Sequence, residues 1–484
     1  MKIVIFDIDT LRPDHLGCYG YHRNTSPNID RIAKDAVRFN RCYASDAPCL
    51  PSRAAFHHGR FGIHTGAINH GGFFADPAPE GATRDFRTSA SHTHWIRLIQ
   101  QAGFHTASVS SFAGRHSSWW FLDGFNEVYD CGKGGTERAD EVVGHAEAFV
   151  DKMQGKDDWL LLFNVWDPHS PYRVPDAYGN PFQHDPPPAW LTQDRLDAQN
   201  ATWGTHSANA TLHSPNAQKP TSREVAAIRT IADFKKWIDG YDVGIRYADD
   251  AVGRVLARLE ATCGGLDDVA IIVTSDHGEN HGELNVYGDH QSADLITNRV
   301  PMIIRWPGAA PRVDTALHYQ MDVSATVASL LGRDVPAAWD GRSFADAFRA
   351  GRSAGRDYLV VSQACWSCQR AVIWDDWVLI KTYEDGLKDW PPLMLFNSKD
   401  DTHETTDLSA AMPAKVAEGL ALLEEWLDAN LRENEGVDPM YGVIAEGGPF
   451  HTRGRLAEYL AYYRAAGKPD IAARMEQRYA GSKC

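Results

Sequence analysis

Three apolar runs in this chain are each followed at once by acidic or histidine residues. The runs are rich in β-branched or leucine side chains, as in strands buried within parallel sheets, and they are residues 2–6, 159–165 and 269–274. Carboxyl ends of parallel strands meet at one edge of a sheet, where ligands bind. We therefore expect a site there, with Asp9, Asp276 and His277 as metal ligands. Taken singly, each of these residues is equally typical of a turn or a helix cap.

Helical and strand-like segments alternate through the first two thirds of the chain. Residues 26–37 are predicted to form a helix, because Ser26-Pro27 is a typical start and Ile29, Ile32, Ala33, Ala36 and Val37 keep helical spacing. Other predicted elements are helices near 92–102, 242–262 and 322–331 and strands at 106–110 and 300–305. This alternation predicts an α/β fold, with a large mixed, mainly parallel sheet flanked by helices.

The character of the sequence changes after residue 350, and we expect three parts. Residues 1–350 form the large α/β domain, and residues 351–440 a smaller C-terminal α+β domain with strands in 357–383, a turn-rich stretch at 395–408 and a helix at 413–431. Residues 441–484 look like a tail of two amphipathic helices that pack on the body or mediate homo-oligomer formation. Residues 175–222 lack any period and are interpreted as an insertion that forms a lid or substrate wall.

Charge and hydropathy exclude some partners. The net charge of −16 over 484 residues argues against binding to nucleic acid, and no apolar run reaches the length of a membrane span, so we expect no membrane partner. The first apolar run meets Asp7 too soon for a secretory leader. We expect a cytoplasmic protein, unless a leader has been removed.

The cysteines do not form a disulfide framework. The chain has eight of them, at positions 18, 42, 49, 131, 263, 365, 368 and 484. Their scatter is typical of a protein from a reducing compartment. The pair Cys365-x-x-Cys368 has no second pair or histidine partners nearby in sequence, so we assign it to packing.

The segment Cys49-Leu50-Pro51-Ser52-Arg53 has the pattern C-x-P-x-R. Its plain interpretation is a cysteine in a loop before a helix, with Pro51 and Ser52 as turn and cap residues. A short motif of this kind is a hypothesis that depends on its structural context.

This segment resembles the signature of the sulfatase family in the alkaline-phosphatase superfamily, in which the cysteine is oxidised to a Cα-formylglycine. The resemblance implies a formylglycine-generating enzyme as a partner during maturation. A thiolate that attacked a sulfate ester would form an S-sulfate with no easy exit. One hydroxyl of an aldehyde hydrate can attack the ester instead, and deprotonation of the other expels the anion.

The resemblance extends from Ile5 to about residue 410 and implies roles for several residues. Residues 9–17 and 275–279 look like the family's two metal motifs, and residues 168–171 look like its substrate-histidine loop. By this similarity Asp9, Thr10, Asp276, His277 and Cys49 hold a divalent metal. Arg53 would clamp the hydrate, and His169 would contact the ester or assist the leaving oxygen.

The metal motifs depart from the usual family pattern at two positions. Many members have a second acidic residue where Thr10 stands. The threonine removes one metal ligand or leaves a place for water. The second motif often ends Asp-Asn and binds Ca²⁺, whereas the Asp276-His277 pair offers an imidazole. This shifts the preference toward Mn²⁺ or Zn²⁺ and leaves Ca²⁺ open.

The substrate-binding residues depart further. The family's Gly-Lys-x-His is replaced by residues 110–113, Ser-Ser-Phe-Ala, and we take Arg115 and His116 as substitutes. A lysine expected after the second metal motif is absent, and His290 is our candidate to contact the transferred group. Asn69 is a further substrate-binding candidate, because related phosphonate and phosphodiester hydrolases have an asparagine at about this distance from the cysteine.

Three functions are open at this stage. The first is hydrolysis of a small anionic sulfate ester, with a sulfated sugar as the default substrate. The second is phosphonate monoester or phosphodiester hydrolysis by the same machinery. The third, from another class, is an inactive binding protein that has kept the fold, although a pure binder has no use for Cys49, Arg53 and the metal residues together.

Overall fold

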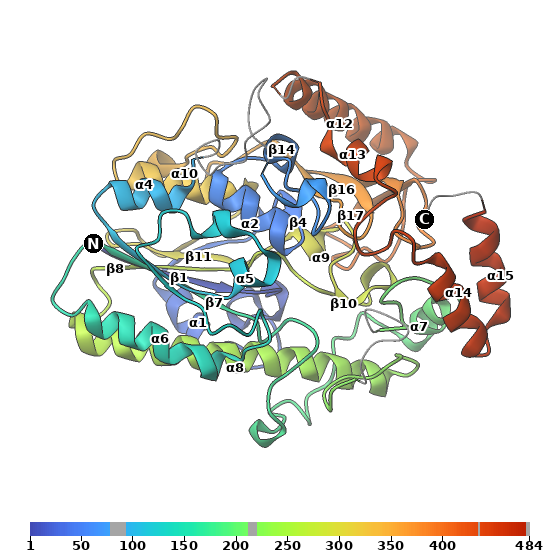
Figure 1. Cartoon of the computed structure of the whole chain (residues 1–484), viewed down its shortest axis with the longest axis horizontal. Coiled ribbons are helices and arrows are strands. Elements are labelled where there is room, and N and C mark those ends of the chain that lie inside the picture. The colour runs from blue at the N-terminus through green and yellow to red at the C-terminus, as the bar shows by residue number, and fades with distance from the viewer. Residues whose placement is uncertain (78–92, 212–219, 434–435, 481–484) are drawn as a thin grey trace.

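The computed structural model describes residues 1–77, 93–211, 220–433 and 436–480. An eight-stranded sheet with the order β12-β2-β11-β8-β1-β7-β5-β6 lies at its centre (Figure 1). Its strands are β1 (Lys2–Ile8), β2 (Val37–Phe39), β5 (His105–Val109), β6 (Glu127–Tyr129), β7 (Trp159–Val165), β8 (Val269–Thr274), β11 (Met302–Arg305) and β12 (Arg312–Asp314).

Most neighbouring strands of this sheet are parallel. Strand β1 pairs in parallel with β7 and β8, β5 pairs in parallel with β6 and β7, and β12 pairs in parallel with β2. Only β11 runs against its neighbours β8 and β2. The predicted mixed, mainly parallel sheet is confirmed, and the strands predicted at 159–165 and 269–274 have those bounds.

Helices cover both faces of the sheet (Figure 1). One face packs on α1 (Pro27–Lys34), α6 (Ala139–Lys152) and α8 (Ile231–Cys263), and the other on α2 (Cys49–His58), α4 (Trp95–Gln101) and α10 (Gln320–Leu330). Side chains alternate along β1, so Val4 and Phe6 join the first core whereas Ile3 and Ile5 join the second. Asp7 has the parity of Ile3 and Ile5 and therefore points to the face that carries α2.

Helix α8 supports the whole length of the first face. Its start has a capping box, in which the Thr230 side chain accepts from Asp233 N at 3.1 Å and Asp233 Oδ2 accepts from Thr230 N at 2.9 Å. It ends at Cys263 and is capped by Gly264, whose φ of 73° lies in the left-handed region. The helix begins at Ile231, earlier than the predicted residue 242, because Phe234, Trp237 and other aromatic side chains extend its buried face.

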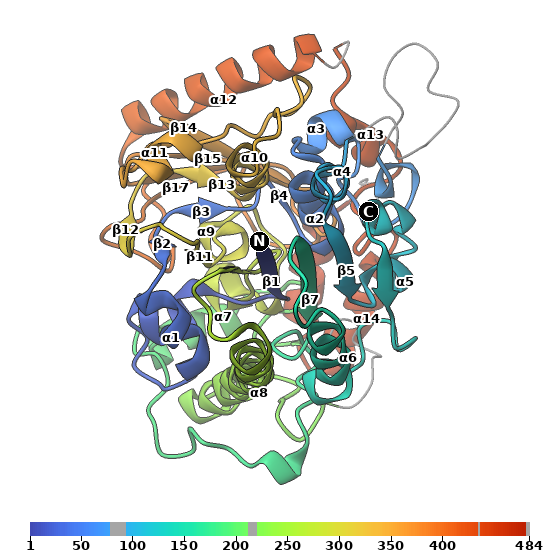
Figure 2. The same cartoon turned by 90° about the vertical axis from the view of Figure 1, so that its left-hand side faces the viewer.

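A second sheet has the order β17-β16-β15-β14-β4 and lies under α12 (Pro413–Glu433), as Figure 2 shows. Its strands are β4 (Asp46–Ala47), β14 (Tyr358–Gln363), β15 (Cys368–Trp374), β16 (Trp377–Glu384) and β17 (Leu393–Asn397). The edge strand β4 comes from the residues just before Cys49, so this sheet draws on both sides of residue 350. The division at 350 and 440 stays a prediction.

Shorter elements complete the described chain. They are helices α3 (Gly62–Thr65), α5 (Phe112–His116), α7 (Gln193–Asn200), α9 (Leu295–Asn298), α11 (Ala345–Arg349), α13 (Pro439–Ala445), α14 (Leu456–Ala465) and α15 (Pro469–Arg478), and strands β3 (Cys42–Tyr43), β9 (Asn280–His281), β10 (Tyr287–Asp289) and β13 (His318–Tyr319). Within the described ranges no helix combines the length and apolar character needed to cross a bilayer.

The C-terminal helices pack on the body. Residues of α14 and α15 share an apolar cluster with Trp203 and Leu387, so the 175–222 insertion supports the tail at Trp203. The insertion contains the regular helix α7, which the sequence pattern had not indicated, and its residues 212–219 lie outside the described chain. Formation of a homo-oligomer stays a prediction.

Two predicted elements are wrong in detail. Val37, assigned to the helix at 26–37, belongs to β2, because α1 ends at Lys34 and Val37 pairs with Ile304 of β11. Residues 395–397, assigned to a turn-rich stretch, lie in β17 and pair with β16. In both cases strand pairing with a distant segment overrides the local pattern.

The buried pair His57 and His94 predicts a pH dependence of stability. Their rings stack with centroids 4.6 Å apart, and burial, followed by nearby positive groups, lowers the pKa of both well below the usual value. The unfolded chain therefore binds protons below about pH 6.5 that the folded chain does not, so stability falls as pH falls below that value. His94→Asn removes one such group and keeps the N-cap acceptor that His94 offers to Ile96 N at 3.2 Å.

We expect the loss of unfolding free energy between pH 7 and pH 5.5 to shrink by about 1 kcal/mol in His94→Asn, measured by urea denaturation. Comparing each protein with itself at two pH values cancels the pH-independent cost of the substitution. The same loss in variant and parent would contradict the assignment.

Candidate active site

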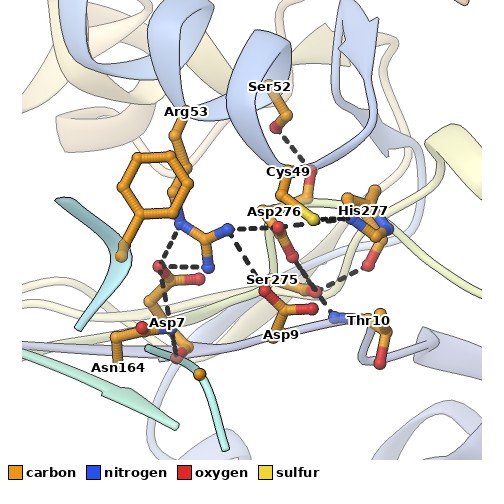
Figure 3. A network of polar contacts seen from close by, with 12 residues as sticks. Asp7, Asp9, Thr10, Cys49, Ser52, Arg53, Asn164, Ser275, Asp276 and His277 are labelled. Atoms are coloured by element: carbon orange, nitrogen blue, oxygen red, sulfur yellow. Dashed lines mark hydrogen bonds and ion pairs between the residues drawn. The ribbon is translucent and has the colours of Figure 1, made fainter. Parts of the chain in front are cut away.

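Residues from three distant segments meet at the carboxyl edge of the central sheet (Figure 3). Asp9 follows β1, Asp276 and His277 follow the adjacent strand β8, and Cys49 is the first residue of α2. The Cys49 Sγ, one oxygen of each carboxylate and one His277 ring nitrogen all lie within 4.8 Å of one another, and all four side chains are buried. The structure thus brings together the residues that the sequence predicted as metal ligands.

Ser52 ties the start of α2 to the second metal segment. Its hydroxyl donates to the carbonyl oxygen of Asp276 at 2.5 Å, and it makes no N-cap bond. The plain interpretation of Ser52 as a cap is therefore wrong. The bond fixes the height of Cys49 above the sheet edge.

The His277 ring is held in one tautomer. Its Nδ1 lies 2.8 Å from the carbonyl oxygen of Gly278, which can only accept, so Nδ1 carries the hydrogen. The bare Nε2 then faces Cys49 Sγ at 3.2 Å and Asp276 Oδ2 at 3.3 Å. This is the arrangement of a histidine prepared to bind a metal ion through Nε2.

Asp7 is a site residue that the sequence analysis missed. Its Oδ2 accepts from Arg53 Nε at 3.2 Å and Nη2 at 3.0 Å, while Arg53 Nη1 reaches Asp9 Oδ2 at 3.2 Å and also contacts Asp276 (Figure 3). Asn164 donates to the Asp7 carbonyl at 3.1 Å. A carboxylate inside the otherwise apolar run of β1 is the signal that could have identified Asp7, because such a group is buried only with a partner.

The site buries more negative than positive charge. Asp7, Asp9 and Asp276 all contact the single guanidinium of Arg53. Burial and the neighbouring Asp276 raise the pKa of Asp9 well above its usual value. Burial alone would raise the pKa of Asp276, but Arg53 and His277 outweigh it and lower this pKa to about 2. Burying carboxylates without full compensation is costly, so the cluster favours an additional cation.

Cys49 is a poor nucleophile as a thiol. Burial, followed by the charges of Asp9 and Asp276, raises the pKa of Cys49 well above its usual value. A nucleophilic cysteine requires the opposite shift, since the thiolate is the reactive form. The site therefore does not activate Cys49 in the manner of a thiol enzyme.

Thr10 has a strained backbone beside the two aspartates. Its φ of 58° lies in the left-handed region, which a β-branched residue rarely adopts and which costs about 1–3 kcal/mol. Two bonds hold this conformation, from Thr10 N to Asp276 Oδ1 at 3.2 Å and from Tyr241 Oη to the Thr10 carbonyl at 2.7 Å. Its Oγ1 is buried without a hydrogen-bond partner among the described residues, as is Asp9 Oδ1.

This donor set fits a divalent metal ion. The site brings together carboxylate oxygens, a bare imidazole nitrogen and the Cys49 side chain. The buried Asp9 Oδ1 has no hydrogen-bond partner among the described residues. Mixed oxygen and nitrogen donors suit Mn²⁺ or Zn²⁺ and are also compatible with Ca²⁺.

The predicted substrate residues lie around this cluster. The His290 ring is 4.1 Å from the His277 ring and 5.8 Å from the His169 ring, measured between centroids. The Arg115 guanidinium lies 4.8 Å from the centre of the Trp166 ring, and its charge opposes the rise in the pKa of Cys49. The roles assigned to these residues stay predictions.

Asn69 and His116 both contact His70, which is not one of the predicted metal ligands. The His116 ring is 5.0 Å from that of His70, and Asn69 Oδ1 accepts from His70 N at 2.9 Å. His451 joins them, with its Nε2 at 2.8 Å from His70 Nδ1. No pattern in the sequence connects His451 to the site, because it lies 381 residues from His70.

Solved structures of known proteins share this fold. One, described as a complex with its substrate D-glucosamine-2-N,6-O-disulfate, is 19% identical, has a TM-score of 0.68 and covers 91% of this chain and 99% of its own. The phosphonate monoester hydrolase of Agrobacterium radiobacter is 18% identical, has a TM-score of 0.67 and covers 89% and 96%. The fold is that of the alkaline-phosphatase-like hydrolases.

The sequence places the chain within this class. The family described as Sulfatase matches residues 2–333, and a curated relative, N-acetylglucosamine-6-O-sulfatase of Bacteroides thetaiotaomicron, is 23% identical over 88% of this chain and 86% of its own length. The chain belongs to the sulfatase family, a family of sulfuric ester hydrolases.

Gly278 provides a test of the second metal segment. A Cβ on Gly278 would lie 2.0 Å from the backbone oxygen of Ile296, so Gly278→Ala must displace residues 275–279. We expect a loss of about 1–3 kcal/mol in unfolding free energy and at least about tenfold weaker Mn²⁺ binding, measured by urea denaturation and titration calorimetry.

Gly144→Ala is the matched control. Gly144 lies within α6, and a Cβ there meets nothing within 4 Å. The control should raise stability by about 0.5–1 kcal/mol and leave Mn²⁺ binding unchanged. Equal metal binding in Gly278→Ala and the parent would show that this segment does not hold the ion.

Proposed function

We propose that this protein hydrolyses a sulfate monoester, with Cys49 converted to Cα-formylglycine and one divalent metal bound by Asp9, Asp276 and His277. The observation that carries this proposal is the position of Cys49. Its side chain stands among three metal-type ligands beside Arg53, and its raised pKa makes it unsuitable as a thiol nucleophile. A formyl group there supplies a hydrate nucleophile, and a divalent metal supplies Lewis-acid polarisation.

The chain's own residues have separate tasks in this proposal. Asp7 accepts from Nε and Nη2 of Arg53 while Asp9 accepts from Nη1, so the guanidinium is oriented before substrate binds. His290 stands next to His277 and His169 stands next to His290, where they can hold or pass a proton at the leaving oxygen. Thr10 would border the metal through its unpartnered Oγ1.

The charge of the site favours a monoanionic reacting group. Burial, followed by nearby positive groups, lowers the pKa of His169 and His290 well below the usual value, so both are neutral near pH 7. The guanidiniums of Arg53 and Arg115 and a divalent metal then face the carboxylates of Asp7, Asp9 and Asp276. The net charge of these groups is about +1. A sulfate monoester matches this balance better than a phosphate monoester dianion.

A phosphonate monoester or a phosphodiester also carries one negative charge and is the second candidate. Two observations favour it: the Asp-His metal pair and the buried Asn69 near His70. The phosphonate monoester hydrolase fold is similar to this one, although likeness at 18% identity concerns the fold alone. Turnover of 4-nitrophenyl sulfate against 4-nitrophenyl phenylphosphonate separates the two, and a preference of orders of magnitude for the phosphonate would reject our first choice.

The substrate that we propose is a sulfated sugar. A curated relative is named for N-acetylglucosamine 6-O-sulfate hydrolysis, and a structural neighbour is described with a disulfated glucosamine. A reducing, cytoplasmic location stays part of this proposal.

The Cys49 peptide tests the proposal directly. After co-expression with a formylglycine-generating enzyme, we expect mass spectrometry to show the formyl form in place of the thiol. Cys49→Ser should lower kcat/KM for 4-nitrophenyl sulfate by at least about 10³-fold, because it removes the nucleophile.

Cys263→Ser is the control for this experiment, since Cys263 ends α8 far from the site in sequence and structure. It should leave kcat/KM unchanged. A thiol mass at Cys49 together with absent turnover would instead support the inactive binding protein.

A further inference from the structure

The C-terminal segment 446–453 contacts the loop of residues 69–73, which follows helices α2 and α3. Phe450 N donates to Asn69 Oδ1 at 3.3 Å, and Phe73 N donates to Glu446 Oε1 at 3.2 Å. The rings of His70 and His451 are hydrogen-bonded at 2.8 Å. Three contacts along a short stretch indicate a defined docking of the two segments.

Glycines in the loop make room for this docking. A Cβ on Gly71 would lie 2.3 Å from the Phe450 ring. A Cβ on Gly72 would lie 2.5 Å from Glu446 Oε2, and its φ of 79° is in the left-handed region. The loop is therefore shaped to receive the C-terminal segment.

His451 is held on a rigid support. Its ring stacks on Trp366 with centroids 4.4 Å apart and planes at 19°, and its backbone N donates to the Cys365 carbonyl at 3.1 Å. Thr452 Oγ1 donates to the Trp366 carbonyl at 3.2 Å. A side chain fixed in this way can hold its hydrogen-bond partner, the His70 ring, in one orientation.

The docked segments leave polar atoms without partners. Asn69 Nδ2, His70 Nε2, His116 Nε2 and His290 Nδ1 are buried, and among the described residues none of them has a hydrogen-bond partner. Asn69 and His290 are at least 95% buried as whole residues. Native proteins rarely leave such groups unpaired, since each costs about 1–3 kcal/mol. Four of them around one site indicate a polar ligand.

These atoms lie next to the proposed catalytic centre. The His70 ring is 5.0 Å from both the His116 and the His451 rings. Burial lowers the pKa of His70, and the charges of His277 and His169 are among the further causes. A neutral imidazole both donates and accepts, so the His70 and His116 rings suit hydroxyl groups better than a second anionic group.

We propose that His70 and His116, with His451 holding the His70 ring in place, form the subsite for the leaving group of the ester, and that this leaving group is a neutral sugar ring with several hydroxyls. Phe450, 42% exposed with its ring 5.1 Å from that of His451, offers an apolar edge beside these hydrogen-bonding groups. The inference rests on the proposed sulfate ester hydrolysis and specifies its substrate. His70 and His116 lie within residues 2–333 that match the family, whereas segment 446–453 with His451 lies outside them.

The test compares substrates with and without a sugar on the formylglycine form of the full chain. The probes are glucose 6-sulfate, galactose 6-sulfate and N-acetylglucosamine 6-sulfate, with 4-nitrophenyl sulfate as the ester that lacks a sugar. We expect at least one sugar sulfate to have the higher kcat/KM. In His451→Ala we expect the KM for that sugar sulfate to rise about tenfold, because the His70 ring loses the hydrogen-bond partner that orients its Nε2 toward the leaving group. The rise in KM for 4-nitrophenyl sulfate, whose leaving group carries no hydroxyl, should be several times smaller.

Two further variants separate binding from folding. His451→Gln keeps a donor and acceptor near the position of Nε2 and should recover most of the KM. His403→Ala is the matched control, because His403 is also half-buried and stacks on a tryptophan, Trp190, at 4.4 Å and 12°. It should leave the KM for the sugar sulfate unchanged.

The outcomes are distinguishable. Hydrolysis of 4-nitrophenyl sulfate with no preference for any sugar sulfate would overturn the subsite and keep the proposed function. An equal loss on both kinds of substrate in His451→Ala would also overturn it, since that pattern indicates a structural role. Absence of turnover on every ester, despite formylglycine at position 49, would overturn both proposals.

Discussion

The contact of one guanidinium with three buried carboxylates organises this molecule. Arg53 extends from α2 toward the sheet and meets Asp7, Asp9 and Asp276, which come from two adjacent strands. Loss of Arg53 would leave three buried carboxylates without their shared cation, which is far more costly than the pairing itself is stabilising. This constraint locks the start of α2 to the sheet and thereby sets the position of Cys49.

The strand geometry explains why these charges meet. Alternation along β1 sends Asp7 to the face that carries α2, and Asp9 lies just past the last pairing of the strand. Parallel pairing in register places the end of β8 beside the end of β1, so Asp276 and His277 arrive at the same height. A one-residue slip would turn Asp7 to the opposite helices and leave Arg53 without its partner.

Much of the fold could be predicted from the sequence, because buried parallel strands have a strong local signal. The runs at 159–165 and 269–274 are bounded by polar residues, and their limits agree with β7 and β8. Val37 and residues 395–397 were misassigned because their strands form only by pairing with distant segments. The convergence of Asp9, Cys49, Asp276 and His277 followed from motifs at strand ends, which local sequence carries.

The rest of the site has no local signal. The link between His70 and His451 joins residues 381 positions apart, and nothing near His451 resembles a functional motif. Asp7 was visible as a carboxylate in an apolar strand, yet its partner was apparent only once α2 was placed over the sheet. Contacts between segments that are far apart in the sequence and carry no recognisable motif are therefore the part of such a site that only a structure reveals.

The burial of Cys49 has a consequence for the order of events in the cell. The residue is 1% exposed, at the start of α2 and next to the segment that follows β8, so no second protein can reach its sulfur in the finished fold. Any enzyme that converts this thiol must bind the segment while it is still extended. Under the proposed function, this conversion would compete with folding in time, and a chain that folds too quickly would keep the thiol.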